Sequence, residues 1–301
     1  MYYVGVDGGG TKTIFALFQA DGTLLDDFTT TTSHFKQIGF DGVGLLLAKG
    51  VNHLLQMHGI QANQVRICFG LAGYGQGQQI REQLQASIQQ HFPGFSYIIA
   101  NDAQIALEGA LNGQDGIMVI AGTGSIALSA IHGVQSRCGG WGYQIGDEGS
   151  GYWIGRKLLS VFSKQADGRL PRMALYHLLM AHAQLNNDFE LISYMEQNQS
   201  RTEVASLTPI GVQAALQRDT SAIEVFCDAG AELAELVLVL AQKHQEEKIL
   251  VSYYGGVFQA GELLLEPLRT RLGKRFNLRQ PQHEPVYGAY LLAKKSEFNM
   301  Q

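Results

Sequence analysis

Hydrophobic and polar positions alternate over residues 2–30, and this alternation predicts three short strands. YYVGVD (2–7) leads through GGGTKT into TIFALFQ (13–19), and an Ala-Asp-Gly turn (20–22) leads into TLLDDFTT (23–30). An Asp-Gly pair between two alternating runs is a strong hairpin signal. The chain is therefore expected to open with an antiparallel meander.

Longer segments then alternate between helical and strand patterns. Apolar residues at helical spacing predict helices over 39–58 and 76–91 and a short helix over 103–111. VRICFGLAG (65–73) and SYIIAND (96–102) are mostly apolar runs of the kind found in buried strands. Strands linked by helices favour parallel pairing, so this half predicts a mixed sheet.

The opening pattern recurs about one domain later. GIMVIAG (116–122), IALSAI (126–131) and VQSRC (134–138) again form strand, Gly/Thr turn, strand, Gly turn, strand. A repeat of this kind predicts two similar α/β lobes with mixed sheets.

The second lobe is expected to continue with a mostly helical region over 152–246. A buried strand (248–254), a helix after GGVF, a strand at 275–280 and a last helix over 284–295 follow. We place an N-terminal lobe at 1–114 and a C-terminal lobe at 115–285, with the final helix, about 286–301, packing back on the N-terminal lobe. No linker rich in proline, serine or charge separates them, so we expect two tightly joined lobes with a cleft between them.

Composition and charge exclude several classes of protein. The chain is 46% hydrophobic and 16% charged with a net charge of −5, which argues against a nucleic-acid or anionic-membrane partner. Its apolar runs are too short to span a bilayer, and its first residues form a strand rather than a signal peptide, so a cytoplasmic location is expected. The three cysteines and nine histidines lack ligand spacing, so we expect neither a protein-ligated transition metal nor an iron–sulfur cluster.

Two glycine-rich turns are candidates for phosphate binding. DGGGTKT (7–13) and AGTGSIA (121–127) expose backbone N–H groups beside hydroxyls, and such concavities bind anions. Neither is a Walker A or dinucleotide motif, because a strand follows each. A tight hairpin with no ligand is the alternative for each turn alone. Their equivalent positions in the repeat favour phosphate binding.

Carboxylates end two of the predicted strands. Asp7 precedes the first glycine turn and is a plausible partner for Mg²⁺, through water. Asn101 and Asp102 end another strand, where either can cap the next helix, or Asp102 can act as a general base. At 255–258, GGVF can let a ribose or flat ring approach the backbone, or simply allow close packing of strand and helix.

These motifs together with GLAG (70–73), PVYGA (285–289) and CGGWGYQIGDEGSGYWIG (138–155) resemble one superfamily. The chain is similar to acetate and sugar kinases, Hsp70 and actin, and within these it resembles the N-acetylglucosamine kinase branch of the BadF/BadG/BcrA/BcrD ATPases. The resemblance implies an α/β fold of two ribonuclease-H-like lobes, with nucleotide and sugar bound in the cleft.

The resemblance also implies roles for individual residues. It implies Asp102 as the catalytic base and Asp7 as the Mg²⁺ partner. Nucleotide contacts are implied for Gly9, Gly10, Thr11, Lys12, Gly122, Thr123, Gly124, Gly255 and Gly256, and sugar contacts for Ser33, His34, Asn101, Asp102, Thr123, Cys138, Gly140 and Asp147.

The segment 138–155 is then interpreted as a wall of the sugar pocket. Its mixed hard and soft ligands do not suit a metal, and the two glycine turns fit phosphate better. Glu148 is expected to favour the start of the following helix, and Trp141 and Trp153 are expected to pack in the core.

The implied activity is ATP-dependent phosphorylation of an amino sugar, with Mg²⁺ accompanying ATP and N-acetylglucosamine phosphorylated at its 6-hydroxyl. Mammalian members have Asn-His-Trp where this chain has Ser33-His34-Phe35, so glucosamine and N-acetylmuramic acid stay open as substrates. An ATPase activator of a radical dehydratase and a sugar-sensing repressor are further alternatives. The first lacks paired cysteines, and the second lacks room for a DNA-binding module before Tyr2. A homodimer formed through 152–246 is also open.

Overall fold

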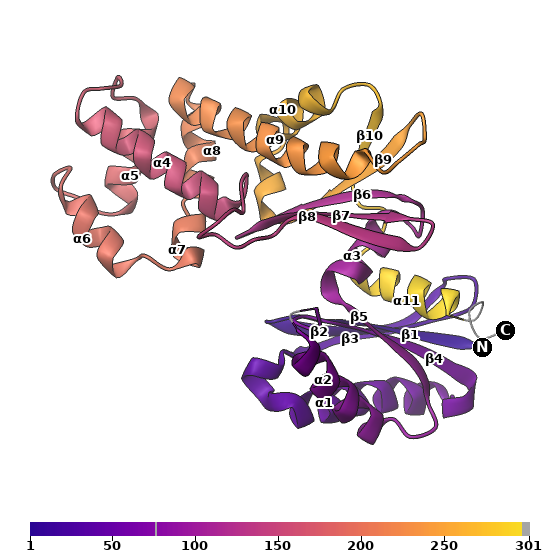
Figure 1. Cartoon of the computed structure of the whole chain (residues 1–301). Coiled ribbons are helices and arrows are strands. Elements are labelled where there is room, and N and C mark those ends of the chain that lie inside the picture. The colour runs from indigo at the N-terminus through magenta and orange to yellow at the C-terminus, as the bar shows by residue number, and fades with distance from the viewer. Residues whose placement is uncertain (76, 297–301) are drawn as a thin grey trace. The chain divides into compact units, whose positions relative to one another are not determined.

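The computed structural model describes residues 1–75 and 77–296, which divide into two compact units. The first unit comprises residues 1–114 and 281–301, and the second comprises residues 115–280. Each unit contains a five-stranded mixed sheet, which confirms the predicted α/β fold class (Figure 1). Within the described residues, no helix is both long and apolar enough to cross a membrane.

The first unit is a sheet in the order β3-β2-β1-β4-β5 with helices on both faces. The first three strands form the predicted antiparallel meander, and β4 and β5 continue in parallel with β1. Its strands are β1 (Tyr2–Gly8), β2 (Lys12–Phe18), β3 (Leu24–Thr31), β4 (Val65–Leu71) and β5 (Ser96–Asn101), and its helices are α1 (Phe35–His58), the 3₁₀ turn η1 (Ala62–Gln64), α2 (Gln78–His91), α3 (Asp102–Ala110) and α11 (Pro285–Lys295).

Alternation along β1 and β2 divides their side chains between two cores. Val4, Val6, Phe15 and Leu17 pack against α1 and α2 on one face. Tyr3, Ala16 and Phe18 pack against α3 and α11 on the other. Figure 1 shows these two pairs of helices on opposite faces of the sheet. This division follows from the period of two in a strand.

Helices α1 and α3 begin earlier than predicted, whereas α2, predicted from residue 76, begins at Gln78; residue 76 lies outside the described residues. The first was predicted from residue 39, but α1 begins at Phe35, and Gly39 interrupts its helical dihedral angles (φ +72°, ψ 166°). The third was predicted from residue 103, but α3 begins at Asp102. In both cases an upstream side chain caps the helix: His34 accepts a hydrogen bond from the Lys36 amide, and Asn101 accepts one from the Gln104 amide.

The second unit repeats the topology of the first, with the strand order β8-β7-β6-β9-β10 matching β3-β2-β1-β4-β5. The predicted repeat is therefore confirmed in the pairing of its strands. Its strands are β6 (Gly116–Ala121), β7 (Ser125–Ile131), β8 (Val134–Gly139), β9 (Ile249–Tyr254) and β10 (Phe276–Arg279), and its helices are α4 (Gly151–Ala166), α5 (Ala174–His182), α6 (Glu190–Gln197), α7 (Arg201–Ala205), α8 (Thr208–Leu216), α9 (Thr220–Ala241), the 3₁₀ turn η2 (Gly256–Ala260) and α10 (Glu262–Leu272).

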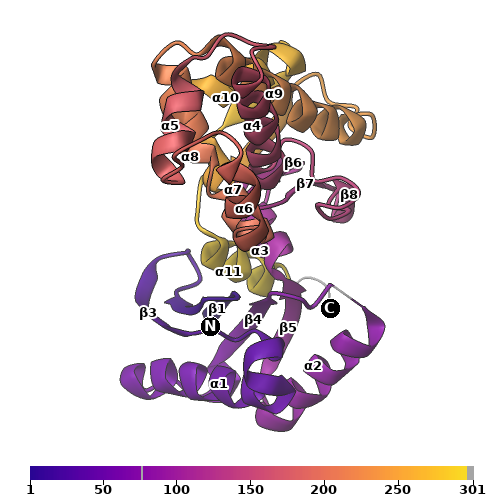
Figure 2. The same ribbon diagram turned by 90° about the vertical axis from the view of Figure 1, so that its left-hand side faces the viewer.

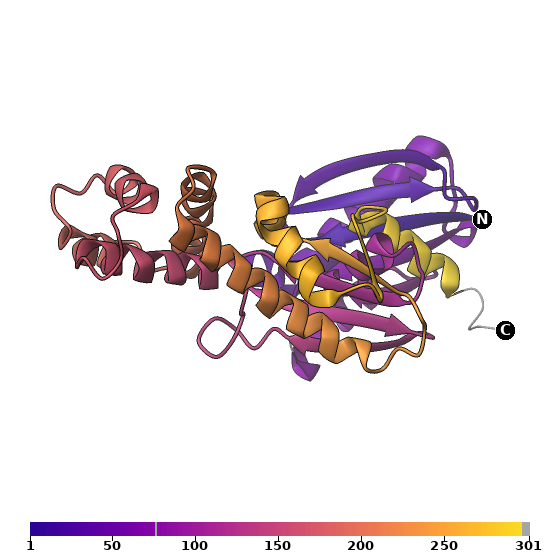
Figure 3. The same cartoon turned by 90° about the horizontal axis from the view of Figure 1, so that it is seen from above.

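Helices α4 to α8 gather at one end of this second sheet, and α9 runs from them along the sheet (Figures 2 and 3). The buried side chain of Asp219 joins three of these helices. Its Oδ1 accepts hydrogen bonds from the first amides of α9, while its Oδ2 accepts from the Leu175 amide at 2.8 Å and from Gln165 Nε2 at 3.4 Å. A buried carboxylate with this many donors stabilises the orientation of α4, α5 and α9.

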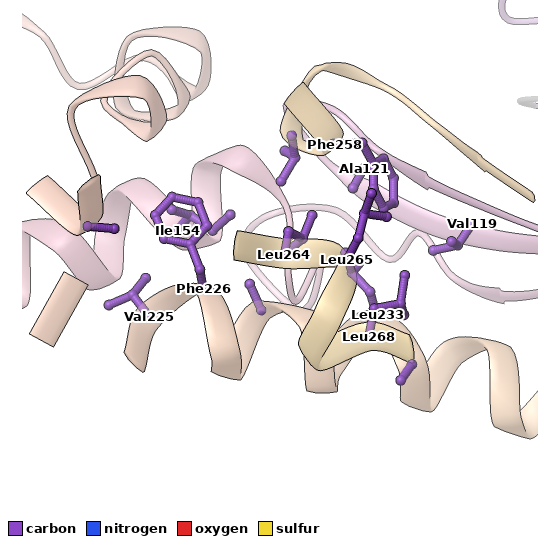
Figure 4. Close-up of a cluster of buried hydrophobic side chains, with 14 of the residues drawn as sticks. Val119, Ala121, Ile154, Val225, Phe226, Leu233, Phe258, Leu264, Leu265 and Leu268 are labelled. Carbon is purple, nitrogen blue, oxygen red and sulfur yellow. The ribbon is translucent and has the colours of Figure 1, made fainter. Parts of the chain in front are cut away.

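Apolar side chains from four segments form the core beside the β6 end of this sheet. Figure 4 shows Ile154 of α4, Phe226 and Leu233 of α9, Leu264 and Leu268 of α10, and Ala121 of β6 converging on one another. Each of these side chains is buried. The core therefore holds the end of β6 against the helices that surround it.

In the first unit, two glycines allow α11 to pack closely on β1 and α3. A Cβ atom added at Gly5 would overlap the Val286 carbonyl oxygen, and one added at Gly288 would overlap the Ile105 carbonyl oxygen. Lys295 then reaches Glu108 at 2.6 Å near the end of α11. The helix contributed by residues 285–295 is thus part of the core of the first unit.

We predict that Gly288→Ala lowers the free energy of unfolding by about 1–3 kcal/mol, because α11 must move away from α3. Urea unfolding at pH 7 measures this. Gly42→Ala is the matched control, since the nearest atoms to an added Cβ there belong to the Ile38 side chain, at 3.3 Å or more, and not to the backbone of another helix. It should leave stability unchanged or raise it by up to about 1 kcal/mol. Equal losses in both variants would contradict the role of Gly288.

Candidate functional site

The turn between β1 and β2 presents backbone N–H groups, because its carbonyl groups are held by side chains. Thr32 donates to the Gly9 oxygen at 3.0 Å, and Gln37 donates to the Gly10 oxygen at 2.6 Å. The Gly9 amide closes the turn on the Lys12 oxygen. Across the described residues, the Gly10 and Thr11 amides donate no hydrogen bond. Two adjacent free amides beside Lys12 are suited to an anion.

Asp7 lies in β1 just before this turn, in a negatively charged environment. Its pKa is raised to about 6, chiefly because the carboxyl is buried. The charges of Asp102 and Glu284 contribute to this rise, while Lys12 opposes it. A bound cation would relieve this excess of negative charge, so the residues around Asp7 fit Mg²⁺.

Asn101 and Asp102 have different roles at the start of α3. Asn101 is the N-cap, with its Oδ1 2.6 Å from the Gln104 amide nitrogen. The side chain of Asp102 is exposed, and its Oδ1 accepts a hydrogen bond from the adjacent Ala103 amide at 3.0 Å. Because Asn101 already caps the helix, the carboxylate of Asp102 is available for chemistry.

The two residues predicted after the third strand, Ser33 and His34, both take part in local structure. His34 caps α1 and stacks on Phe35 with ring centroids 4.9 Å apart. Ser33 is only 4% exposed, and a Cβ atom on Gly8 would overlap its Oγ. This Oγ has no hydrogen-bond partner among the described residues. Ser33 therefore lies against the end of β1, with a buried hydroxyl that can still bind a ligand.

In the second unit, the turn between β6 and β7 is held by helix α4. The amides of Gly151 and Tyr152, in the first turn of α4, donate to the carbonyl oxygens of Gly122 (2.8 Å) and Thr123 (3.3 Å). The Gly122 amide donates to the Gly124 oxygen, whereas the Thr123 and Gly124 amides donate to no described residue. As in the first unit, the carbonyl groups are engaged and two adjacent amides are free to bind an anion.

A glycine after β9 packs directly on this second turn. Gly255 has a φ of +114°, and a Cβ atom there would overlap the Ala121 carbonyl oxygen. Glycine is needed at this position both for its conformation and for its close approach. The following 3₁₀ turn, η2, is thereby placed beside Gly122.

A pocket of about 660 Å³ opens between this turn, η2 and the helical region. A volume of this size is typical of small-ligand sites. None of the described residues that line it is charged. They are Gly122, Thr123, Gly151, Thr202, Ala205, Ser206, Thr208, Pro209, Val212, Gln213, Gly256, Val257, Gln259 and Ala260.

Seven of these lining residues come from α7, α8 and the link between them, which the sequence analysis did not single out as part of a site. One available signal was the Ser200–Glu203 capping box, which marks the start of α7. That signal locates a helix but not the wall of a pocket, because the contact with the turn is long-range.

The glycine-rich segment 138–155 is anchored at several points. Cys138 pairs with Ala127 across the sheet, and Gly140 has a φ of +71° and packs on Ile126. Trp153 packs on the core as predicted, but the same prediction for Trp141 is wrong, since Trp141 is 65% exposed. Instead, the Arg137 guanidinium lies over its indole ring, with Cζ 5.0 Å from the ring centroid.

Asp147 is buried within this segment and has a left-handed backbone with a φ of +61°. Its Oδ1 accepts from the Gly142 amide at 3.2 Å, and its Oδ2 accepts from Arg201 at 3.2 Å. Each carboxylate oxygen keeps a further lone pair with which it can accept a hydrogen bond from a ligand.

A group of possible metal ligands also lies in this unit, at Asp115, His132 and Glu246. His132 Nδ1 lies 3.1 Å from Asp115, and Glu246 lies 3.3 Å from His244 Nδ1. His132 and Glu246 are exposed, and exposed acidic groups of this kind commonly lie together without a metal.

Comparison with known proteins yields relatives that match over nearly the full length. The chain is 29% identical to the N-acetyl-D-glucosamine kinase of Dictyostelium discoideum, over 98% of both chains. It is also 29% identical to the N-acetylmuramic acid/N-acetylglucosamine kinase of Clostridium acetobutylicum, over 97% of this chain and 98% of the relative.

A solved structure from Chromobacterium violaceum, provisionally assigned as an N-acetylglucosamine kinase, has a similar fold. It superposes with a TM-score of 0.74 at 29% identity, over 97% of this chain and 98% of that one. The model of the BadF/BadG/BcrA/BcrD ATPase family matches residues 4–293, so the chain belongs to that family.

Proposed function

We propose that this protein is an ATP-dependent kinase of an amino sugar, with N-acetylglucosamine phosphorylated at its 6-hydroxyl. The observation that carries the proposal is the uncharged pocket ending at the Gly122–Gly124 turn. An uncharged pocket beside free backbone amides suits a nucleoside whose phosphates extend onto the turn. The names of the relatives indicate the acceptor class.

In this proposal Gly255 and Gly256 flank the adenosine, and the phosphates are bound by both glycine turns. Gly122, Thr123 and Gly124 provide one set of contacts, and Gly9, Gly10, Thr11 and Lys12 provide the other. Asp7 binds Mg²⁺ through water, and Mg²⁺ supplies neutralising charge at the nucleotide's phosphates when bound.

Asp102 is the proposed general base, accepting the proton of the attacking sugar hydroxyl as the phosphoryl group is transferred. Sugar contacts are assigned to Ser33, His34, Asn101, Thr123, Cys138, Gly140 and Asp147. The buried, unpartnered Oγ of Ser33 supports its place on this list. Most of the catalytic effect is expected from positioning and charge, because phosphoryl transfer needs few reacting side chains.

The identity of the amino sugar is the narrower part of the proposal, and glucosamine and N-acetylmuramic acid are the alternatives. Several predictions from the sequence stay predictions. They are the lobe boundaries at 1–114 and 115–285, the cytoplasmic location and the homodimer. The radical-dehydratase alternative is disfavoured because its iron–sulfur cluster needs cysteines at a subunit interface, whereas Cys68 is buried and Cys138 lies in the segment assigned to the sugar.

A substrate panel tests the proposed activity. We expect ADP release from Mg-ATP with N-acetylglucosamine, measured beside N-acetylmannosamine, N-acetylmuramic acid, glucosamine and glucose. If another amino sugar is phosphorylated in place of N-acetylglucosamine, the kinase proposal holds and only its substrate changes. The absence of turnover on all five would refute the kinase proposal.

Asp102→Asn should lower kcat roughly 10²–10⁴-fold while the affinity for sugar is kept, because the base is lost and the side-chain size is not. Steady-state kinetics and calorimetric sugar binding measure the two effects. Asp27→Asn, an exposed position on β3 of the same unit, is the control and should keep normal turnover. Near-normal kcat in the Asp102 variant would remove its catalytic role.

Asp7→Asn should change how the stability of the metal-free protein depends on pH. Because the pKa of Asp7 is raised to about 6 from 3.8, folding opposes its ionisation, and the wild type loses stability as pH rises through this window. The variant should be more stable than the wild type by about 1–3 kcal/mol at pH 7 and equal to it near pH 3. Urea unfolding without Mg²⁺ across this range measures the difference, and a pH-independent difference would contradict the assignment.

A further inference from the structure

One arginine, to which no role was assigned, lies on the second glycine turn. Arg201 is the first residue of α7, and its Nη2 lies 3.2 Å from Oδ2 of Asp147. A Cβ atom added at Gly124 would overlap this same Nη2. The guanidinium therefore rests directly on the turn whose free amides are proposed to bind phosphate.

The neighbours of Arg201 connect it to the pocket. Thr202, the next residue along the chain, lines the pocket, and so does Thr123, which precedes Gly124. The described residues that line this pocket carry no charge, yet a nucleotide triphosphate carries several negative charges. Arg201 places a cation next to the end of the pocket where those charges would lie.

The hydrogen bonding of Arg201 is incomplete. Its Nε is buried and has no partner among the described residues, where its side chain makes a single hydrogen bond, to Asp147. A guanidinium has five N–H donors in a planar fork that matches phosphate oxygens. A buried donor without a partner is unfavourable, so this group is suited to a ligand that completes its bonding.

We propose that Arg201 contacts the phosphates of the nucleotide bound in this pocket while it also holds the buried carboxylate of Asp147. This rests on the proposed kinase function, and it adds a phosphate ligand within the second unit. Arg201 would thus bridge a residue proposed to bind the sugar and a turn proposed to bind the phosphates.

The test compares binding of Mg-ATP and of adenosine by titration calorimetry. In Arg201→Met, the affinity for Mg-ATP should fall roughly 10- to 100-fold, as expected for loss of charge-assisted hydrogen bonds, while that for adenosine stays within about twofold. A purely structural role would weaken both ligands alike, because adenosine occupies the same pocket.

In Arg201→Met, the buried carboxylate of Asp147 loses its partner, and this alone destabilises the protein. A second pair of variants avoids that effect because both lack the carboxylate. Asp147→Asn should keep the preference for Mg-ATP over adenosine, since Arg201 is still present. The double variant Asp147→Asn/Arg201→Met should lose that preference. If the two variants have the same preference, Arg201 serves only Asp147 and the inference is wrong.

Arg172→Met is the matched control. Arg172 also pairs with an aspartate, Asp188 at 2.9 Å, and also lies over a tyrosine ring, that of Tyr176, as Arg201 lies over Tyr143. It should bind both ligands like the wild type. Wild-type protein that fails to bind Mg-ATP would overturn the kinase proposal and this inference together. Wild-type binding with an unchanged preference in Arg201→Met would overturn the role of Arg201 alone.

Discussion

The pocket of the second unit depends on one constraint. At the turn joining β6 and β7, the backbones of neighbouring segments are in direct contact. Two amides of α4 bond to the turn's carbonyl groups, and Gly255 lies against the Ala121 oxygen from the other side. No side chain separates these segments, so the helix, the turn and η2 hold one another at fixed distances. The pocket is therefore bounded by segments in direct backbone contact, which favours a preorganised site.

In the first unit, the turn between β1 and β2 also has free amides, but different groups hold its carbonyl oxygens. Its turn is held by the side chains of Thr32 and Gln37 rather than by the start of a helix. The repeat in the sequence thus extends to the strands and the turns but not to the groups that support them. The shared topology determines where a phosphate-binding turn can form. The local groups around each turn determine which donors hydrogen-bond to its carbonyl oxygens and so leave its amides free.

Local patterns predicted the strands and turns, because alternation, glycines and Asp-Gly pairs act over a few residues. They did not show that Glu284 lies near Asp7, that Arg201 rests on Gly124, or that α7 and α8 form a wall of the pocket. Each of these depends on segments far apart in the chain. The choice between Asn101 and Asp102 as the helix cap was likewise open in the sequence, since both residue types cap well and only their geometry separates them.

The two candidate sites share an unmet electrostatic requirement. The pKa of Asp7 is raised, first by burial of its carboxyl and then by the charge of Asp102, and at Arg201 there is a buried donor without a partner. Each arrangement is unfavourable in the free protein, and natural sequences keep such features where function requires them. A cation satisfies the first and an anion the second. In the proposed function Mg²⁺ would satisfy the first requirement and the nucleotide's phosphates the second, and each would stabilise the unit that binds it.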